Sequence, residues 1–450
     1  FIQNAKNPKG TNGFGRSPQV QSLYATTTLG YKDYLFMDLT ARNDWSSALP
    51  KANQSYFYPS VGLTAIVTDM IQMPKWISYG KARLTLANAG YGGTQYLDRN
   101  YFDVAPGGVI KTPQTRSLGD YKPELTSSFE AGLDWRFFDG RLGLDATYYI
   151  TKTKNQLLAV ATPYASLFVN QYINAGLIEN KGVELTLSGT PIRKDKFSWD
   201  LNLNFADNNN KIIRLTDALR EAILIDDRQV MIKAAEGGSY GDMYMVNWAK
   251  DSQGRRLVDD NGRIILTPKN SYVGNYNPNY MVGLNNNFSY RNFGLSFLID
   301  YRNGGTVISG TQAIIDADGH SKRSLEGRES GLVLDAYTQA GVKNTKSISA
   351  ETYWASVGNW TPVGDLYAYS GTNLRLREVV FGYNFPKTLI SKTGFIQAAK
   401  LSLVGRNLFF FQRDAPFDPE MATGTGNTGG VEYASLPSTR NIGLNLKLSF

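Results

Sequence analysis

The stretch Asn441-Ile442-Gly443-Leu444-Asn445-Leu446-Lys447-Leu448-Ser449-Phe450 alternates apolar residues with polar residues or glycine from one end to the other. A period of two places the apolar side chains on one face of a β-strand and the remaining side chains on the opposite face. About ten residues is also the length of a strand that crosses a bilayer in a β-barrel. The stretch therefore predicts an amphipathic, membrane-spanning strand.

The same alternation returns upstream, for example at 35–42, 142–148, 183–188 and 201–205. Such runs, bounded by turn residues, indicate about thirteen strands of membrane-spanning length. We predict them at 19–31, 33–43, 56–68, 78–90, 124–137, 141–154, 178–189, 196–206, 280–290, 293–303, 371–385, 397–410 and 438–450. The side chains that we expect to face lipid are Leu35, Met37, Leu39, Leu142, Leu144, Leu185, Leu187, Leu201, Leu203, Leu444, Leu446 and Leu448.

The predicted connections alternate in length. Short ones lie at 31–33, 138–140, 190–195 and 291–292, with intermediate ones at 69–77 and 386–396. Long ones lie at 44–55, 91–123, 155–177, 207–279, 304–370 and 411–437, and within them we expect a short helix at 323–340, ended by Gly341. Short turns at one rim and long loops at the other are typical of an outer-membrane barrel whose short side faces the periplasm. We therefore predict an all-β fold, a transmembrane antiparallel β-barrel.

The odd number of predicted strands carries a further expectation. Bacterial single-chain barrels normally have an even number of strands, so an odd number is expected upstream of residue 1. In a plugged barrel of about 22 strands, about nine would lie there. We expect residues 1–450 to form the C-terminal part of an outer-membrane β-barrel, with the plug domain and the first strands outside this sequence.

The composition excludes several other classes of protein. The chain has no Cys and a single His, His320, which excludes thiolate metal sites and histidine relays. A glycosidase-like β-enzyme needs a carboxylate pair in a cleft, whereas Asp and Glu are scattered here. We therefore expect no catalytic residues, no metal and no cofactor. The 47 Lys and Arg against 39 Asp and Glu include no long basic run, so we expect no nucleic-acid partner.

Short motifs add a more specific signal. They are Arg42-Asn43-Asp44-Trp45-Ser46-Ser47, Tyr56-Phe57-Tyr58-Pro59-Ser60, Tyr79-Gly80-Lys81-Ala82-Arg83, Glu179-Asn180-Lys181-Gly182-Val183-Glu184-Leu185, Leu374-Arg375-Leu376-Arg377-Glu378, Gly382-Tyr383-Asn384-Phe385-Pro386, Gly405-Arg406-Asn407-Leu408, Phe417-Asp418-Pro419-Glu420 and Pro437-Ser438-Thr439-Arg440. In order and spacing, these motifs resemble the SusC/RagA family of TonB-dependent transporters. The resemblance covers roughly residues 20–450.

The resemblance implies TonB-dependent import of a bulky nutrient, an oligosaccharide or a peptide, across the outer membrane. It also implies a SusD-like surface lipoprotein that closes over the extracellular loops, and contact with the TonB complex through the missing N-terminal part. A passive porin, or a structural surface barrel without energy coupling, is the alternative. The upstream sequence distinguishes the two, because only the transporter needs a plug domain with a TonB-contact segment.

Site residues are predicted from aromatic and charged positions. Rigid aromatic rings offer a large contact area at a small entropic cost, which suits both sugar faces and protein partners. We predict ligand contacts at the loop bases from Trp45, Tyr91, Tyr96 and Asp418. We predict contacts with the lipoprotein, in the two longest loops, from Tyr240, Tyr244, Trp248, Trp354 and Trp360. Because an unpaired buried charge is costly, we expect lumenal arginines to pair with carboxylates of the plug or the wall: Arg42, Arg83, Arg375, Arg377 and Arg406.

Overall fold

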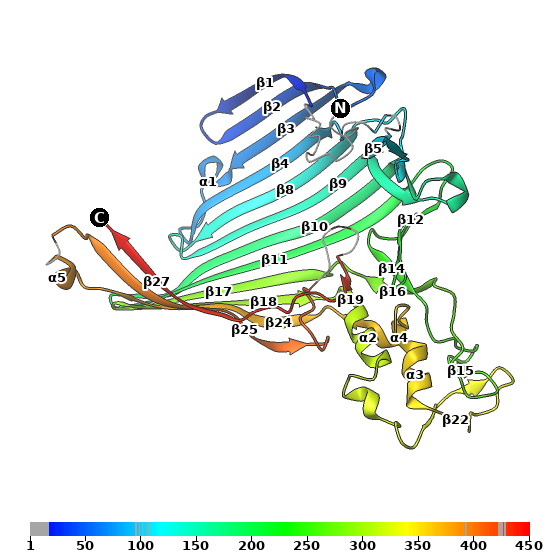
Figure 1. The fold of residues 1–450 in the computed structure, drawn as a ribbon. Helices are drawn as coiled ribbons and strands as arrows, with labels where there is room; N and C mark the ends of the chain where they lie inside the picture. Colours follow the sequence, from blue (N-terminus) through cyan, green and yellow to red (C-terminus); the bar gives the residue numbers. More distant parts are fainter. Residues whose placement is uncertain are drawn as a thin grey trace.

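A curved antiparallel sheet dominates the computed structural model, which describes residues 18–450 apart from 95–96, 99, 101, 106–107, 392–393, 422–425 and 427–428 (Figure 1). The sheet has 14 strands, and all except β7 (Thr115–Arg116) follow one another in a single path, which we call the wall. Its strands, in order, are β1 (Val20–Tyr31), β2 (Leu35–Ser46), β3 (Ser55–Ile66), β4 (Ile77–Tyr91), β8 (Glu124–Phe137), β9 (Leu142–Ala161), β10 (Asn170–Lys194), β11 (Phe197–Arg214), β17 (Tyr280–Tyr290), β18 (Phe293–Asn303), β24 (Asn373–Asn384), β25 (Ala398–Arg413) and β27 (Asn441–Ser449).

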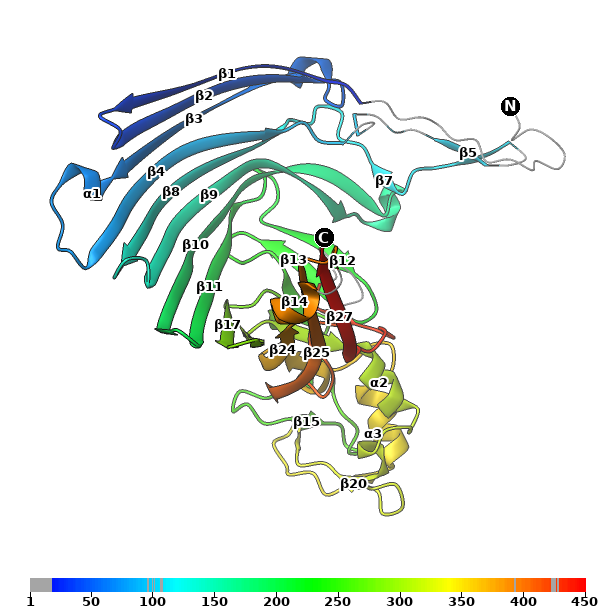
Figure 2. The same ribbon diagram turned by 90° about the vertical axis from the view of Figure 1, so that its left-hand side faces the viewer.

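Each predicted strand corresponds to one strand of the wall, so the predicted strand order is confirmed. Every neighbouring pair is antiparallel, and β7 adds a parallel pair to β10. Figure 2 shows how the sheet curls across its width from β1 to β27. The curvature follows from the right-handed twist of neighbouring strands.

The register places the predicted apolar set on one face. Opposed residues share a face, and Leu144 opposes Leu187, which opposes Leu203, which opposes Leu284. In the N-terminal strands, Met37 of β2 opposes Leu63 of β3. In the C-terminal strands, the three leucines of β27 oppose apolar residues of β25. The shared face is therefore confirmed, while its contact with lipid stays a prediction. We call it the apolar face and the opposite one the polar face.

Three neighbouring strands are longer than the sequence predicted. β9 has 20 residues, β10 has 25 and β11 has 18. Most of the segment predicted as a loop at 155–177, and the start of that at 207–279, is therefore strand. Asn155 has a φ of +57° and stands opposite Gly176, where the ladder lacks a pair. The register is the same on both sides of this interruption, but residues 157–161 are all apolar, so a period-two pattern does not reveal the rest of β9.

Short and long connections separate to opposite ends of the strands, as predicted (Figure 1). Tight turns and the short helices α1 (Val67–Met70) and α5 (Lys387–Ile390) lie at one end, which we call the short-turn rim. Within the described residues of this rim, basic side chains outnumber acidic ones. They are Lys32, Lys75, Arg141, Arg193, Lys194, Lys196, Arg291 and Lys387 against Asp33, Asp69, Asp139 and Asp195.

The connections at the other end fold into a layer of their own, the loop layer. Its main sheet joins β12 (Glu221–Asp226), β13 (Met231–Ala235), β14 (Asp242–Met245) and β16 (Ser271–Asn275). A second sheet places β19 (Thr306–Ser309) between β23 (Ala368–Ser370) and β26 (Val431–Glu432), beside α2 (Gly310–Ala317), α3 (Ala350–Val357) and α4 (Gly364–Tyr367). Smaller pairs are β5 (Asp103–Ala105) with β6 (Val109–Lys111), β15 (Leu257–Val258) with β21 (Tyr337–Thr338), and β20 (Leu332–Val333) with β22 (Ser347–Ile348).

Single 3-10 turns lie at Lys51–Asn53, Tyr164–Ser166 and Arg323–Leu325. Across the described part of the chain, no helix combines the length and the apolar character that crossing a membrane requires.

The helix predicted at 323–340 is wrong. Gly327 and Gly331 have φ values of +67° and +72°, which a right-handed helix does not accept. The helices lie on either side of this segment. Ser309 caps α2 and Ser349 caps α3, because each hydroxyl oxygen accepts the backbone N–H three residues further on. A serine at this position is a helix-start signal that the sequence already contained.

Candidate functional site

The polar face carries charged side chains that pair within the wall. Arg83 donates from Nη1 and Nη2 to the two carboxylate oxygens of Asp145, at 3.1 and 2.9 Å. Arg42 Nε donates to Asp44 at 2.7 Å. Charge-assisted hydrogen bonds of this kind are shorter and stronger than those between neutral groups. The predicted pairing with wall carboxylates is confirmed for Arg42–Asp44, Arg83–Asp145 and Arg406–Glu378.

A cluster of five charged groups lies where the connection between β25 and β27 returns to the wall. Arg375 and Arg377 of β24 contact Glu420, Arg375 also contacts Asp418, and Arg377 also contacts Asp300 of β18. Arg375 Nη1 lies 3.2 Å from Asp418 Oδ2, and both side chains are buried. Burial raises the pKa of Glu420, but hydrogen bonds and charge from the two arginines lower it more, so it stays ionised. The cluster fastens this connection to the wall.

One hydrophobic core joins the loop layer to the long strands. Leu158, Ile173 and Ile178 of β9 and β10 pack with Ile232 and Met243 of β13 and β14. The last two side chains are fully buried. Apolar burial stabilises by about 25 cal/mol per Å² removed from water. The extensions of the strands past the membrane-spanning part therefore serve as the base on which the layer is built.

A second core lies among the helices of the layer. Trp354 of α3 and Tyr367 of α4 are buried there, and the guanidinium carbon of Arg323 lies 5.3 and 5.1 Å from their ring centroids. Arg323 also contacts Asp316 of α2, whose side chain has no exposed surface. Burial raises the pKa of Asp316, but hydrogen bonds, led by that from Arg323, lower it more. The ionised pair is part of the interior of the layer.

Sequence reasoning missed a polar anchor of the layer. Glu432 of β26 is buried and accepts hydrogen bonds from the hydroxyls of Ser309 and Thr311, each at 2.6 Å. Its partners lie 123 and 121 residues away in the chain. No local motif could have identified it, because only the docking of β26 onto β19 brings the three together.

The three predicted ligand residues that the structure describes, Trp45, Tyr91 and Asp418, do not come together. Tyr91 is 56% exposed and lies on the polar face, which agrees with a lumenal position. Trp45 lies on the apolar face, at the rim opposite the short turns, where barrels carry aromatic girdles. This position does not agree with the expected ligand contact. Side chains alternate between the two faces along β2, and Trp45 shares the face of Met37 and Leu39. Asp418 is buried in the charged cluster, and Tyr96 lies outside the described residues.

The five predicted partner residues all lie in the loop layer but differ in exposure. Trp248 and Trp354 are only 3% and 8% exposed, because they fill the second core. Their burial does not agree with direct contact to a partner. Tyr240 packs against the first core and Tyr244 is half-buried in β14. Trp360 is 46% exposed at the surface of the layer.

A curved wall with one apolar face, a charged opposite face and an ordered loop layer at one rim is typical of an outer-membrane β-barrel. A family model described as "TonB dependent receptor-like, beta-barrel" matches residues 2–408. The chain belongs to this family, and its location is the outer membrane. The predicted resemblance to TonB-dependent receptors is therefore confirmed.

Relatives agree with this assignment. TonB-dependent receptor P26 of Formosa agariphila is 26% identical over 96% of this chain and 46% of its own length. TonB-dependent receptor SusC of Bacteroides thetaiotaomicron is 24% identical over 93% of this chain and 42% of its own length. The structure of the RagAB peptide importer in the "closed-closed" state matches with a TM-score of 0.74 at 22% identity, over 96% of this chain and 48% of that chain. The chain spans about half the length of the curated relatives it matches.

Proposed function

We propose that this chain forms part of the wall, and the extracellular loop layer, of a transporter that imports a bulky nutrient across the outer membrane. The nutrient is an oligosaccharide or a peptide. The TonB complex supplies the energy through a part of the protein that precedes this chain, and a SusD-like surface lipoprotein closes over the loops. The function needs no covalent chemistry and no cofactor.

The loop layer is the observation that carries the proposal. Loops longer than about 12–15 residues are uncommon unless they are functional or disordered. Here two long connections build hydrophobic cores and a buried ion pair at a single rim. A layer that is ordered in this way supports a role in holding a large ligand or partner at the mouth of the barrel.

The relatives and the polar face support the same proposal. One relative is named as a TonB-dependent receptor, SusC, and the RagAB structure is that of a peptide importer. Paired charges and amides along the polar face present hydrogen-bonding groups to a water-soluble cargo. The apolar face carries mainly aliphatic and aromatic side chains, which suit lipid instead.

Uptake by living cells tests the energy coupling. Cells that carry the natural polypeptide containing this chain would be given labelled oligosaccharides or peptides, with TonB present or deleted. We expect uptake that requires both this protein and TonB. Uptake that continues unchanged without TonB would instead support the alternative, a passive porin or a structural barrel without energy coupling.

Partner docking is tested separately at the loop layer. We propose that the lipoprotein contacts the surface around Trp360 together with Tyr240 and Tyr244, while the buried Trp248 and Trp354 support that surface from within. Trp360→Ala should weaken co-purification with the lipoprotein encoded beside this protein, since exposed Trp side chains are frequent binding hot spots. Trp76→Ala, an exposed tryptophan next to the short-turn rim, is the matched control. Equal loss in both variants, or none in either, would refute the assignment.

Of the predicted ligand residues, we propose Tyr91 as a residue that contacts the nutrient in the lumen. Tyr91 is exposed on the polar face below the loops, and Tyr96 remains a candidate from the sequence. Tyr91→Ala should raise the concentration at which uptake is half-saturated without changing the amount of protein in the membrane. An unchanged uptake curve would remove Tyr91 from the ligand set.

A further inference from the structure

A gap in the apolar face lies next to the short-turn rim. Leu142 of β9 opposes Gly189 of β10, and Gly189 opposes Leu201 of β11, so these three residues form one row across three strands. The middle position of the row has no side chain. A groove of about 390 Å³ remains there, within the range of small-molecule sites.

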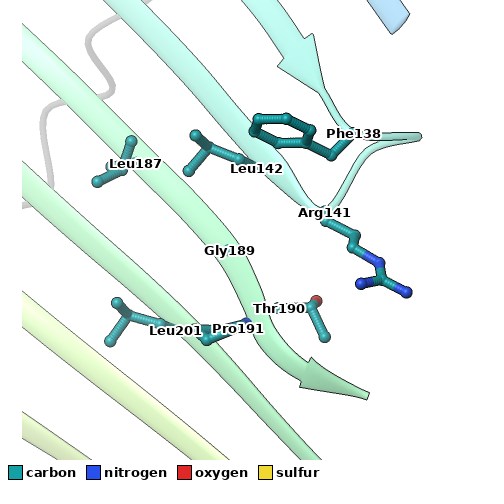
Figure 3. A pocket seen from close by; sticks show the side chains of 8 residues that line it. All are labelled: Phe138, Arg141, Leu142, Leu187, Gly189, Thr190, Pro191 and Leu201. Carbon is teal, nitrogen blue, oxygen red and sulfur yellow. The ribbon is translucent and has the colours of Figure 1, made fainter. Parts of the chain in front are cut away.

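The lining of the groove changes character along its length (Figure 3). Leu142, Leu187 and Leu201 line the part toward the middle of the wall, and Arg141 and Thr190 stand at the end toward the turn. Figure 3 shows the Arg141 guanidinium pointing away from these leucines. The register shift between Gly189 and Ile192 bends β10 at this end, and Pro191, which lacks an N–H, occupies the shifted segment.

Charge distinguishes the end of the groove from its interior. Among the described residues Arg141 makes no ion pair, and its side chain is exposed. By contrast, the nearby Arg136 of β8 lies 3.8 Å from Asp134. The surrounding short-turn rim is rich in Lys and Arg, as described above. Basic residues at a membrane interface attract anionic lipid headgroups.

We propose that this groove is a binding site for one glycerophospholipid of the periplasmic leaflet. One acyl chain lies over Gly189 between the three leucines, and the phosphate lies beside Arg141. The groove is apolar toward the middle of the wall and basic at the end next to the turn. A phospholipid of this leaflet has its acyl tail and its headgroup in the same order. The site prefers an anionic headgroup, because the rim around the phosphate carries excess positive charge.

Native mass spectrometry of the natural polypeptide in detergent provides the test. Purified, delipidated protein would be incubated with phosphatidylglycerol or with phosphatidylethanolamine, and retained lipid would be counted. Gly189→Leu fills the groove without a backbone clash, since a Cβ there has its nearest contacts at 3.7 and 3.9 Å. We expect wild-type protein to retain one phosphatidylglycerol about tenfold more strongly than Gly189→Leu. Arg141→Gln should abolish the preference over phosphatidylethanolamine.

Matched controls separate the site from general effects. Ala146→Leu adds a leucine to the same face of β9, two rows away from the gap, and Arg193→Gln removes a charge from the same rim. Neither should change retention. Equal retention by wild type and Gly189→Leu, or equal loss in Ala146→Leu, would overturn the proposal. Heat-dependent migration on gels verifies that each variant is folded. If Gly189→Leu is misfolded, the headgroup preference of Arg141→Gln decides the test: an unchanged preference for phosphatidylglycerol would overturn the proposal.

Discussion

The wall and the loop layer are stabilised in different ways. In the wall, apolar side chains point outward along every strand, and its charges pair on the opposite face. In the loop layer, apolar side chains are buried in cores of their own, as in a water-soluble domain. This difference is the one expected for a wall whose apolar face meets lipid and a layer that is surrounded by water. One chain therefore follows two patterns of burial, and they meet at the long ends of β9, β10 and β11.

Removing the last strand should have the largest effect. Deletion of residues 441–450 takes away β27, the only strand beyond β25 in the described wall, and exposes the ladder of β25 to lipid. Unpaired backbone groups are not tolerated there, so we expect loss of outer-membrane assembly, measured as folded protein in membrane fractions. A replacement stretch with the same alternation should restore it. Normal folded yield after the deletion would contradict the role of the wall edge.

A cavity in the loop layer should act locally. Ile232→Ala removes a fully buried side chain from the first core and should destabilise the layer by about 2–5 kcal/mol. Hydrogen exchange should quicken in β12, β13 and β14 and stay unchanged in β1 to β4. Val333→Ala, which shortens an aliphatic side chain of the same layer that is 59% exposed, is the control. If exchange quickened equally in the N-terminal strands, the two regions would not be independent.

Two adjacent residues of β11 test the faces of the wall. Leu203→Arg places a charge on the apolar face, six residues from the β10–β11 turn, and should destabilise the barrel by about 2–4 kcal/mol if that level is the bilayer midplane. Asn204→Arg, on the polar face, should cost about 0.5 kcal/mol or less. Urea unfolding in phospholipid vesicles measures both. Similar losses in the two variants would be incompatible with one lipid-facing side.

The smallest expected effect is a pH dependence limited to the loop layer. Pairing with Arg323 holds the pKa of Asp316 below its ordinary value of 3.8. The stability from this lowered pKa is fully present above 3.8 and is lost as pH falls through the lower, folded value. Limited proteolysis should therefore cut the layer faster only at pH below about 4. Asp316→Asn should be less stable at neutral pH and should lack this transition; an unchanged acid transition would exclude Asp316 as its source.

The strands of the wall were predictable because their signal is local. Alternation of apolar and polar residues reports the two faces of a strand without any knowledge of its neighbours, and it located every strand of the wall. The extension of β9 was missed because residues 157–161 are all apolar and show no alternation. Positive φ at Gly327 and Gly331 ended the helix expected from apolar residues alone.

The site was less predictable because exposure depends on packing. Aromatic residues in long loops suggested contact surfaces, yet Trp248 and Trp354 fill a core and Trp45 lies on the apolar face. The lumenal arginines were expected to find carboxylates, and the sequence could not say which ones. Arg375 meets Asp418, 43 positions further along the chain. Such pairings need the distant segment to return to the wall.

The sequence by itself determined the strand order, the two faces of the wall, the separation of short from long connections and the family resemblance. Each of these depends on residues close together in the chain, where the periodicity of a strand or the spacing of a motif is set by local backbone geometry. The tertiary structure alone decided the rest: the cores of the loop layer, the anchor at Glu432 and the groove over Gly189. These features depend on which segments of a curved, closely packed sheet lie side by side, and side-chain exposure is fixed only when those segments meet.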